Sequence, residues 1–126
     1  MLRSYYSIFT EEEDGGYSVT FDEFNGGTQG DDLEEAMTNA REFLAGILAY
    51  YIEENIPLPK RVDHIHPRDL SENQFVTLIQ ADPTPYIKNK TIRKNVTIPE
   101  WLAVRAENDK ANFSKILTDS LFEKYG

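Results

Sequence analysis

The stretch of residues 91–99 restricts the possible folds most narrowly, because polar and apolar residues alternate along it with a period of two. Such alternation is typical of a β-strand with one apolar face. That face carries Ile92, Val96 and Ile98, with Lys94 as an exception. Pro99 suits the first turn of a helix, and two short helical patterns follow it. Such a small segment cannot hold a core alone, so we expect it to need a second copy of itself.

Pairing of two such strands predicts an intertwined dimer, with a two-stranded ribbon above four helices. The predicted dimer core comprises Ile92, Val96, Ile98, Leu102, Leu117 and Leu121. The opposite face of the ribbon would present Arg93, Asn95 and Thr97 twice. Arg can bind guanine edges and Asn adenine edges through paired hydrogen bonds, and a ribbon fits the major groove. The alternative is an edge strand whose polar residues only face solvent.

Three features of residues 91–126 resemble the ribbon-helix-helix module of DNA-binding repressors. They are the alternating strand, a predicted helix over 100–107, and residues 112–115, which open the last helix. Asn112 precedes a helical apolar stripe, so it can cap that helix, and free amides there together with Lys115 can hold a DNA phosphate. The predicted DNA-binding residues are Thr91, Arg93, Asn95, Thr97, Asn112, Ser114 and Lys115.

Charge divides the chain into two parts of opposite sign, although the net charge of the whole is −9. Residues 1–86 contain five basic and seventeen acidic residues, a net charge of −12. Residues 87–126 contain eight basic and five acidic residues, a net charge of +3. An acidic body attracts basic partners and repels nucleic acid, whereas a basic tail can approach phosphate. The division therefore predicts two separate binding tasks.

Two prolines, Pro83 and Pro85, mark the border between these parts, because each restricts its own backbone and that of the preceding residue. We therefore predict a first domain over residues 1–82, a linker over 83–90, and a second domain over 91–126.

The first domain has the pattern of a small α+β fold. The expected elements are strands over 5–9, 17–21 and 28–30, a helix over 31–54, and a strand over 74–79. Asp31 and Glu34 have the spacing of a capping box at the start of the helix. An apolar stripe follows along the same helix and predicts a face buried in the core. The final strand is apolar enough to be central in the sheet.

Five short segments make the chain resemble the HicB antitoxin family: residues 15–21, 28–36, 39–40, 93–100 and 112–114. The resemblance spans nearly the whole chain and keeps the order of the motifs. It implies a degraded ribonuclease-H-like first domain that binds a small, basic, RNA-cleaving HicA-type toxin. It also implies a ribbon-helix-helix domain that binds the operon's own promoter. Residues 25–27, Asn-Gly-Gly, depart from the Pro-Gly-Cys turn of many relatives.

Acidic residues of the first domain are the predicted contacts for a basic toxin. They comprise Glu11, Glu12, Glu13, Asp14, Asp22 and Glu23, and we add the aromatic Tyr17. A metal-dependent nuclease of this fold needs converging carboxylates, one of them on the first strand, and residues 5–9 contain none. His64 and His66, with Asp63 and Asp69, are better explained as loop residues than as a metal site, and no Cys is present to complete one.

Together these observations predict a bacterial, cytoplasmic antitoxin that binds rather than catalyses and needs no cofactor or metal. It would neutralise its toxin and repress its own operon by binding double-stranded promoter DNA. We expect a homodimer through the second domain, and a heterotetramer or larger assembly with toxin. No membrane contact is expected, because the sequence has no apolar run long enough to cross a bilayer. The alternatives are a ligand-sensing regulator without a toxin partner and an active ribonuclease-H-like enzyme.

Overall fold

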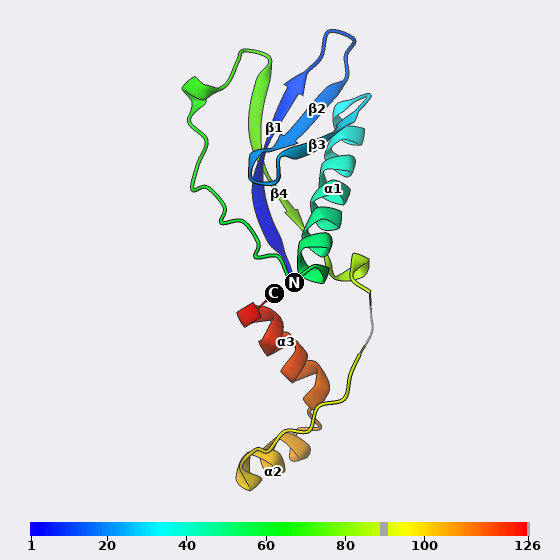
Figure 1. Cartoon of the computed structure of the whole chain (residues 1–126), viewed down its shortest axis with the longest axis vertical. Coiled ribbons are helices and arrows are strands. Elements are labelled where there is room, and N and C mark those ends of the chain that lie inside the picture. The colour runs from blue at the N-terminus through cyan, green and yellow to red at the C-terminus, as the bar shows by residue number, and fades with distance from the viewer. Residues whose placement is uncertain (89–90, 126) are drawn as a thin grey trace. The chain divides into compact units, whose positions relative to one another are not determined.

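The computed structural model describes residues 1–88 and 91–125. The chain divides into two compact units, one of residues 2–88 and one that contains residues 91–125 (Figure 1). Residues 89 and 90 of the predicted linker lie outside the described residues, as does residue 126 of the predicted second domain.

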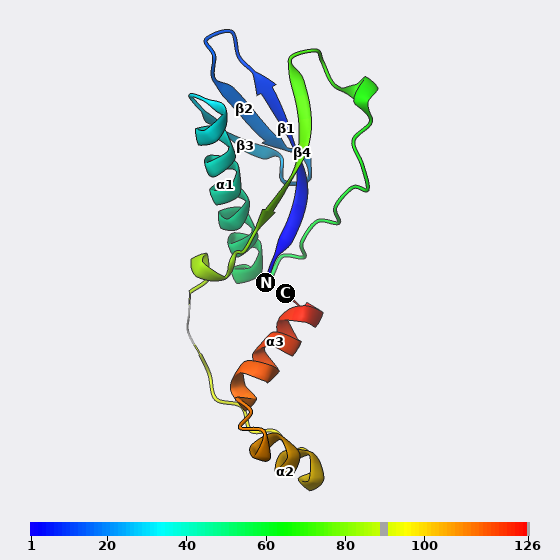
Figure 2. The ribbon, with the colours of Figure 1, turned by 180° about the vertical axis from the view of Figure 1, so that it is seen from behind.

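One antiparallel sheet forms the body, residues 2–88, with the strand order β3-β2-β1-β4 (Figures 1 and 2). Its strands are β1 (Arg3–Glu11), β2 (Tyr17–Phe21), β3 (Gly26–Gly30) and β4 (Gln74–Ala81). The register places Phe9 opposite Val19 on one side and opposite Phe75 on the other. The predicted α+β class is therefore confirmed, and β1 is longer at both ends than the predicted strand over 5–9.

Two predictions about the strands are wrong. Residues 26–27 were expected in a turn, but β3 begins at Gly26, and the chain turns instead through a 3₁₀ segment (Asp22–Phe24) and the left-handed Asn25 at φ 49°. The strand over 74–79 was expected at the centre, but β4 lies at the edge and β1 lies between β2 and β4. Alternate residues of β4 face the core, among them the buried Ile79 and Ala81. The apolar residues at the intervening positions of this edge strand lie on the opposite face of the sheet.

Helix α1 (Leu33–Glu53) packs against β3, β2 and β4 on one face of the sheet (Figure 1). Its N-cap is Asp32 and not the predicted Asp31, because Asp32 Oδ1 accepts a hydrogen bond from the Glu35 amide at 2.8 Å. Glu35 Oε1 in turn accepts from the Asp31 amide at 3.3 Å, so the reciprocal capping bonds are shifted by one residue. A Cβ on Gly30 would lie 2.3 Å from the Ala36 amide nitrogen, so only glycine allows this close approach of helix and strand.

The core of the body lies between the sheet and α1. Its buried residues are Tyr5, Phe9, Val19, Phe21, Phe24, Ala36, Ala40, Leu44, Ala45, Leu48, Ile79 and Ala81.

The body continues beyond the predicted boundary at residue 82. Pro83 is fully buried, a 3₁₀ turn (Thr84–Tyr86) packs against α1, and the Lys88 amide donates to Glu53 Oε1 at 2.8 Å. A second 3₁₀ turn (Pro67–Asp69) interrupts the long connection from α1 to β4.

The second unit contains two helices within residues 91–125, α2 (Glu100–Asn108) and α3 (Phe113–Tyr125). The predicted strand over 91–99 is not a strand in the single chain. A strand is held by hydrogen bonds to a neighbouring strand, and within residues 91–125 none runs beside this segment. Neither helix buries a residue. This unit therefore has no closed core of its own.

Candidate protein-binding and DNA-binding surfaces

The tight turn from β1 to β2 carries the first group of predicted toxin-binding residues. Glu11, Glu12, Glu13 and Asp14 are all exposed. Glu12 Oε1 accepts a hydrogen bond from the Ser18 hydroxyl at 2.7 Å, and Asp14 Oδ1 accepts from the Gly16 amide at 3.0 Å. Two of the carboxylates thus fix the shape of the turn, while those of Glu11 and Glu13 project without a hydrogen-bond partner among the described residues.

The acidic turn lies beside the N-terminus of α1, because Tyr17 pairs with Gly30 in the sheet register. The helix start adds four carboxylates, those of Asp31, Asp32, Glu34 and Glu35. Anionic side chains are favourable at the N-terminus of a helix. Residues 4–40 contain no Lys, Arg or His, so β1, β2, β3 and the start of α1 bring no basic side chain of their own to this end, and Arg3 lies at the far end of β1.

The structure separates Asp22 and Glu23 from this acidic end, because they follow β2 at its opposite end. Glu23 Oε2 is buried and makes no hydrogen bond to any described residue. Burial raises the pKa of the Tyr5 hydroxyl, and the Glu23 carboxylate raises that pKa further. The same hydroxyl donates to the Pro59 carbonyl at 2.7 Å, which holds the long loop against the sheet. The predicted toxin-binding residues therefore do not form one continuous surface.

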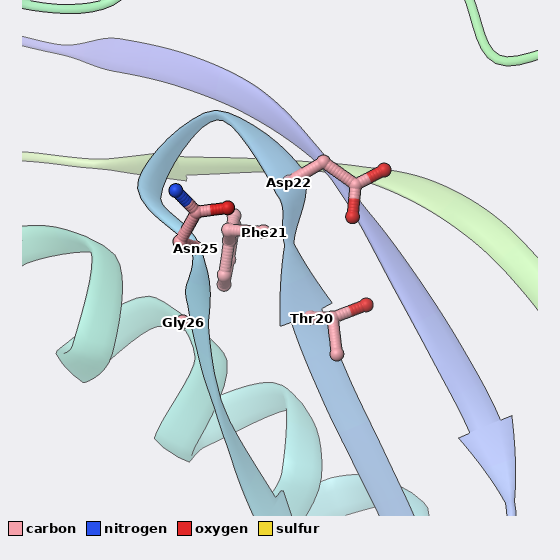
Figure 3. Close-up of a pocket in the computed structure, with 5 residues that line it drawn as sticks. All are labelled: Thr20, Phe21, Asp22, Asn25 and Gly26. Carbon is pink, nitrogen blue, oxygen red and sulfur yellow. The ribbon is translucent and has the colours of Figure 1, made fainter.

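A depression of about 440 Å³ lies beside Asp22 (Figure 3). It is lined by Thr20, Phe21, Asp22, Asn25 and Gly26. The side chains of Thr20, in β2, and Asp22, in the 3₁₀ segment that follows, point to the same side in Figure 3. Asp22 is the single acidic residue among those that line it. Among the described residues no group of three or more His, Cys, Asp or Glu side chains could hold a metal ion.

The two histidines lie in the long connection between α1 and β4. Both are exposed, and His66 Nδ1 accepts a hydrogen bond from the Arg68 amide at 3.4 Å. This contact belongs to the local 3₁₀ turn and gives His66 a structural role in the loop.

In the second unit, apolar side chains line a groove of about 490 Å³. The lining residues are Lys94, Val96, Ile98, Leu102, Ala106, Phe113, Ser114, Ile116, Leu117 and Ser120. Every second residue from 94 to 98 faces this groove, which is the alternation that the sequence predicts. Several apolar side chains remain strongly exposed, including Ile92 at 74%, Val96 at 65% and Trp101 at 63%. The predicted dimer-core list omitted Phe113 and Ile116, although their helical spacing with Leu117 and Leu121 is visible in the sequence.

The predicted DNA-binding residues fall into two groups. Thr91, Arg93, Asn95 and Thr97 are exposed and are absent from the groove lining. Asn112 Oδ1 accepts from the Lys115 amide at 3.0 Å, so it caps α3. Lys115 Nζ forms an exposed ion pair with Asp119 at 2.9 Å, a contact weak enough to exchange for a phosphate. Ser114 instead lines the apolar groove.

Solved structures with the same fold cover between 64% and 98% of this chain. A chain of a toxin–antitoxin complex from Streptococcus pneumoniae has a TM-score of 0.62 and 25% identity, over 98% of this chain and 99% of that one. The Burkholderia pseudomallei antitoxin HicB has a TM-score of 0.60 and 17% identity, over 98% and 99% of the two chains. A chain of the HicA3 and HicB3 toxin–antitoxin complex has a TM-score of 0.52 and 22% identity, over 64% of this chain and all of that one. No curated protein sequence matches this chain.

Residues 2–88 thus form an acidic α+β body, and residues 91–125 contain a helical unit of different architecture. The model of the HicB-like antitoxins of bacterial toxin–antitoxin systems matches residues 5–120, and the chain belongs to that family. None of the helices in the described residues has the length and hydropathy that a membrane crossing requires.

Proposed function

We propose that this chain neutralises a small, basic, RNA-cleaving HicA-type toxin through its body and represses its own operon through its second unit. Both tasks are binding tasks, so the proposal assigns no catalytic residue and no cofactor. Family membership and the likeness to a chain of a solved toxin–antitoxin complex support the toxin partner. The body would be a degraded ribonuclease-H-like fold. The absence of an acid on the core face of β1 from Tyr5 to Phe9 supports the loss of nuclease chemistry.

The observation that carries the second task is the unburied apolar surface of residues 91–125. Side chains of the sequence-predicted dimer core, Val96, Ile98, Leu102 and Leu117, meet in one groove and remain exposed in the single chain. Contiguous exposed apolar surface marks an interaction site. A second copy of the unit provides the same apolar surface and would close both grooves about a two-fold axis.

The proposed dimer gives residues 91–99 the strand partner that they lack in one chain. Two copies would form an antiparallel ribbon, with Val96 and Ile98 toward the helices and Arg93, Asn95 and Thr97 outward. A ribbon of this kind enters the major groove, where Arg and Asn discriminate bases. Asn112 and Lys115 would hold phosphates at the start of α3. With toxin bound, the assembly would be a heterotetramer or larger.

Co-expression with the product of the adjacent gene tests the first task. A tagged full-length chain should retain a small basic protein and abolish its cleavage of RNA. Recovery of the chain alone, with RNA cleavage unchanged, would refute the antitoxin proposal. Gel-shift titration of the purified chain against its own promoter tests the second task. Promoter affinity should fall as salt rises, because phosphate contacts release counterions.

A further inference from the structure

Helix α1 leaves one corner of its own face of the sheet uncovered. It packs beside β3 and β2 and reaches β4 toward the C-terminal end of that strand (Figure 1). Phe75, near the other end of β4, is 39% exposed although its ring stacks on the buried Phe9. Tyr17 is partly exposed beside it. We call the exposed surface formed by Phe75 and Tyr17 the aromatic corner.

Ring contacts and hydrogen bonds between neighbouring strands hold the aromatic corner in place. The rings of Phe9 and Phe75 stack with centroids 5.0 Å apart, and Tyr17 meets Phe75 edge-on at 6.4 Å. The Glu11 amide donates to the Asn73 carbonyl at 2.8 Å, and the Asn73 side-chain amide donates to the Glu11 carbonyl at 3.1 Å. These bonds tie the end of β1 to the start of β4. A partner would therefore find these rings already positioned, and little conformational entropy would be lost on binding.

The surroundings of the aromatic corner select for a basic partner. The acidic turn 11–14 follows β1 at this end, and Glu72 lies in the turn that leads into β4. Residues 69–81, like residues 4–40, contain no Lys, Arg or His. A Lys or Arg side chain placed over an aromatic ring gains a cation–π contact, and the surrounding carboxylates would pair with further basic groups. A second copy of the body would instead bring like charges together, which disfavours self-association here.

We propose that the aromatic corner and the acidic turn 11–14 form the surface on which the basic toxin docks, with Phe75 as its apolar anchor. This inference rests on the proposed antitoxin function and specifies the site that performs it. Asp22 and Glu23, at the opposite end of β2, lie outside this surface. The competing apolar surface is the other face of the sheet, where Tyr6 pairs with Leu78 and Ile8 with Val76. The strand residues around that patch are polar and uncharged (Ser4, Thr10, Ser18 and Gln80), and the Glu12 carboxylate reaches its edge through the hydrogen bond with Ser18. The charge on the two faces therefore does not decide between them, and the variants below do.

One matched pair of variants on β4 separates the two faces. Phe75→Ala and Leu78→Ala each remove one large apolar side chain, 39% and 46% exposed, from opposite faces of the same strand. Calorimetric titration with the co-expressed toxin should show at least about a tenfold loss of affinity for Phe75→Ala, as for an aromatic hot spot. Leu78→Ala should bind within about twofold of the parent. If Leu78→Ala lost as much as Phe75→Ala, or more, the toxin would dock on the other face.

A second pair controls for the packing of Phe75 on Phe9, which Phe75→Ala disturbs. Glu13→Lys and Glu42→Lys change the net charge equally at two exposed positions, one in the acidic turn and one on α1. Glu13→Lys should weaken toxin binding several-fold more than Glu42→Lys at low salt, and the difference should shrink as salt screens the charges. Equal losses would mean that only the overall charge of the body matters, and the aromatic corner would be refuted.

Failure of this inference can be told apart from failure of the proposed function. If the parent chain did not bind the adjacent gene product, the antitoxin function and the docking surface would both be refuted. If the parent bound tightly while Phe75→Ala and Glu13→Lys bound equally well, the antitoxin function would stand and the docking surface alone would be wrong. Promoter binding by all four variants should equal that of the parent, because none of them alters residues 91–125.

Discussion

The two units of this chain bury their apolar residues in different ways. In the body, Leu44 and Leu48 of α1 are completely buried against the sheet. In the second unit, Leu117 and Leu121 of α3 have the same helical spacing, yet both are more than 40% exposed. Apolar periodicity thus predicts that a face will be covered, and it does not say whether the cover comes from the same chain. The body closes a core within one chain, whereas helices α2 and α3 of the second unit bury no residue.

This contrast explains how the two proposed tasks can share a short chain. A body that closes its own core can present a rigid surface to a toxin without a second copy. A unit that folds only as a pair presents each DNA-binding residue twice, as a two-fold symmetric operator requires. The predictions below test this difference, beginning with the change that should have the largest effect.

Cutting the chain between the units should separate the tasks completely. A fragment of residues 1–88 should fold, bind toxin and block RNA cleavage, and it should not bind the promoter. A fragment of residues 91–126 should fold only at concentrations that support a dimer. Circular dichroism over a dilution series and an RNA-protection assay check both expectations. A folded 1–88 fragment that failed to protect RNA would show that the second unit contributes to inhibition.

The position of the cut should itself matter. A fragment that ends at residue 82 loses the buried Pro83 and the bond from the Lys88 amide to Glu53. We therefore expect 1–82 to melt at a lower temperature than 1–88. Equal melting temperatures would mean that residues 83–88 act as a linker, as the sequence analysis predicts.

Truncation of one leucine in each unit should give losses of different kinds. Leu48→Ala in the 1–88 fragment should lower the free energy of unfolding by about 2–5 kcal/mol at any protein concentration. Leu117→Ala in the full chain should instead raise the dimer dissociation constant by more than about tenfold. Urea denaturation and analytical ultracentrifugation measure the two effects. A concentration-independent loss for Leu117→Ala would indicate that the helical unit has a core of its own.

Single substitutions on the outward face of residues 91–99 should weaken DNA binding and leave the dimer intact. Arg93→Ala and Asn95→Ala should each cost about 1–3 kcal/mol of promoter discrimination, because each removes one base contact. Lys124→Ala, in the last turn of α3, removes the same charge as Arg93→Ala and should have a smaller effect. Gel-shift titration against the promoter and a scrambled duplex checks this. Unchanged specificity in both Ala variants would exclude this segment as the reader.

Much of the body could be predicted from its sequence, because its elements follow local rules. Alternation located β2, and helical spacing located α1 to within a residue or two at each end. The edge position of β4 could not be predicted, because strand order depends on which strand pairs with β1, and composition alone does not record that choice. The exposure of Phe75 follows from the same fact, so the sequence analysis predicted Tyr17 of the aromatic corner and missed Phe75.

In the second unit, the sequence predicted a strand that the structure of one chain does not contain. The sequence predicted both helices, and four residues of the predicted dimer core line the groove: Val96, Ile98, Leu102 and Leu117. Alternation along residues 91–99 predicts a strand, but a strand needs a neighbouring strand to accept and donate its backbone hydrogen bonds. Within residues 91–125 of one chain no such neighbour is present.

The smallest effect should come from the helix caps, which form a matched pair across the two units. Asp32 caps α1 through the Glu35 amide at 2.8 Å, and Asn112 caps α3 through the Lys115 amide at 3.0 Å. Replacing either residue by Ala should cost about 0.5–2 kcal/mol. For Asp32→Ala the loss should appear as a lower melting temperature of 1–88 at every concentration. For Asn112→Ala it should appear as weaker dimerisation, because α3 gains its stability from the pair.

The variant Asn112→Asp sharpens this last comparison, because aspartate caps a helix as well as asparagine does. It should leave the dimer dissociation constant unchanged and still weaken promoter binding, since a carboxylate at this position would repel a phosphate held by the first amides of α3. Ultracentrifugation and gel-shift titration on the same samples separate the two effects. If Asn112→Asp bound the promoter as tightly as the parent, Asn112 would only cap its helix. The proposed phosphate contact with the first amides of α3 would then be refuted.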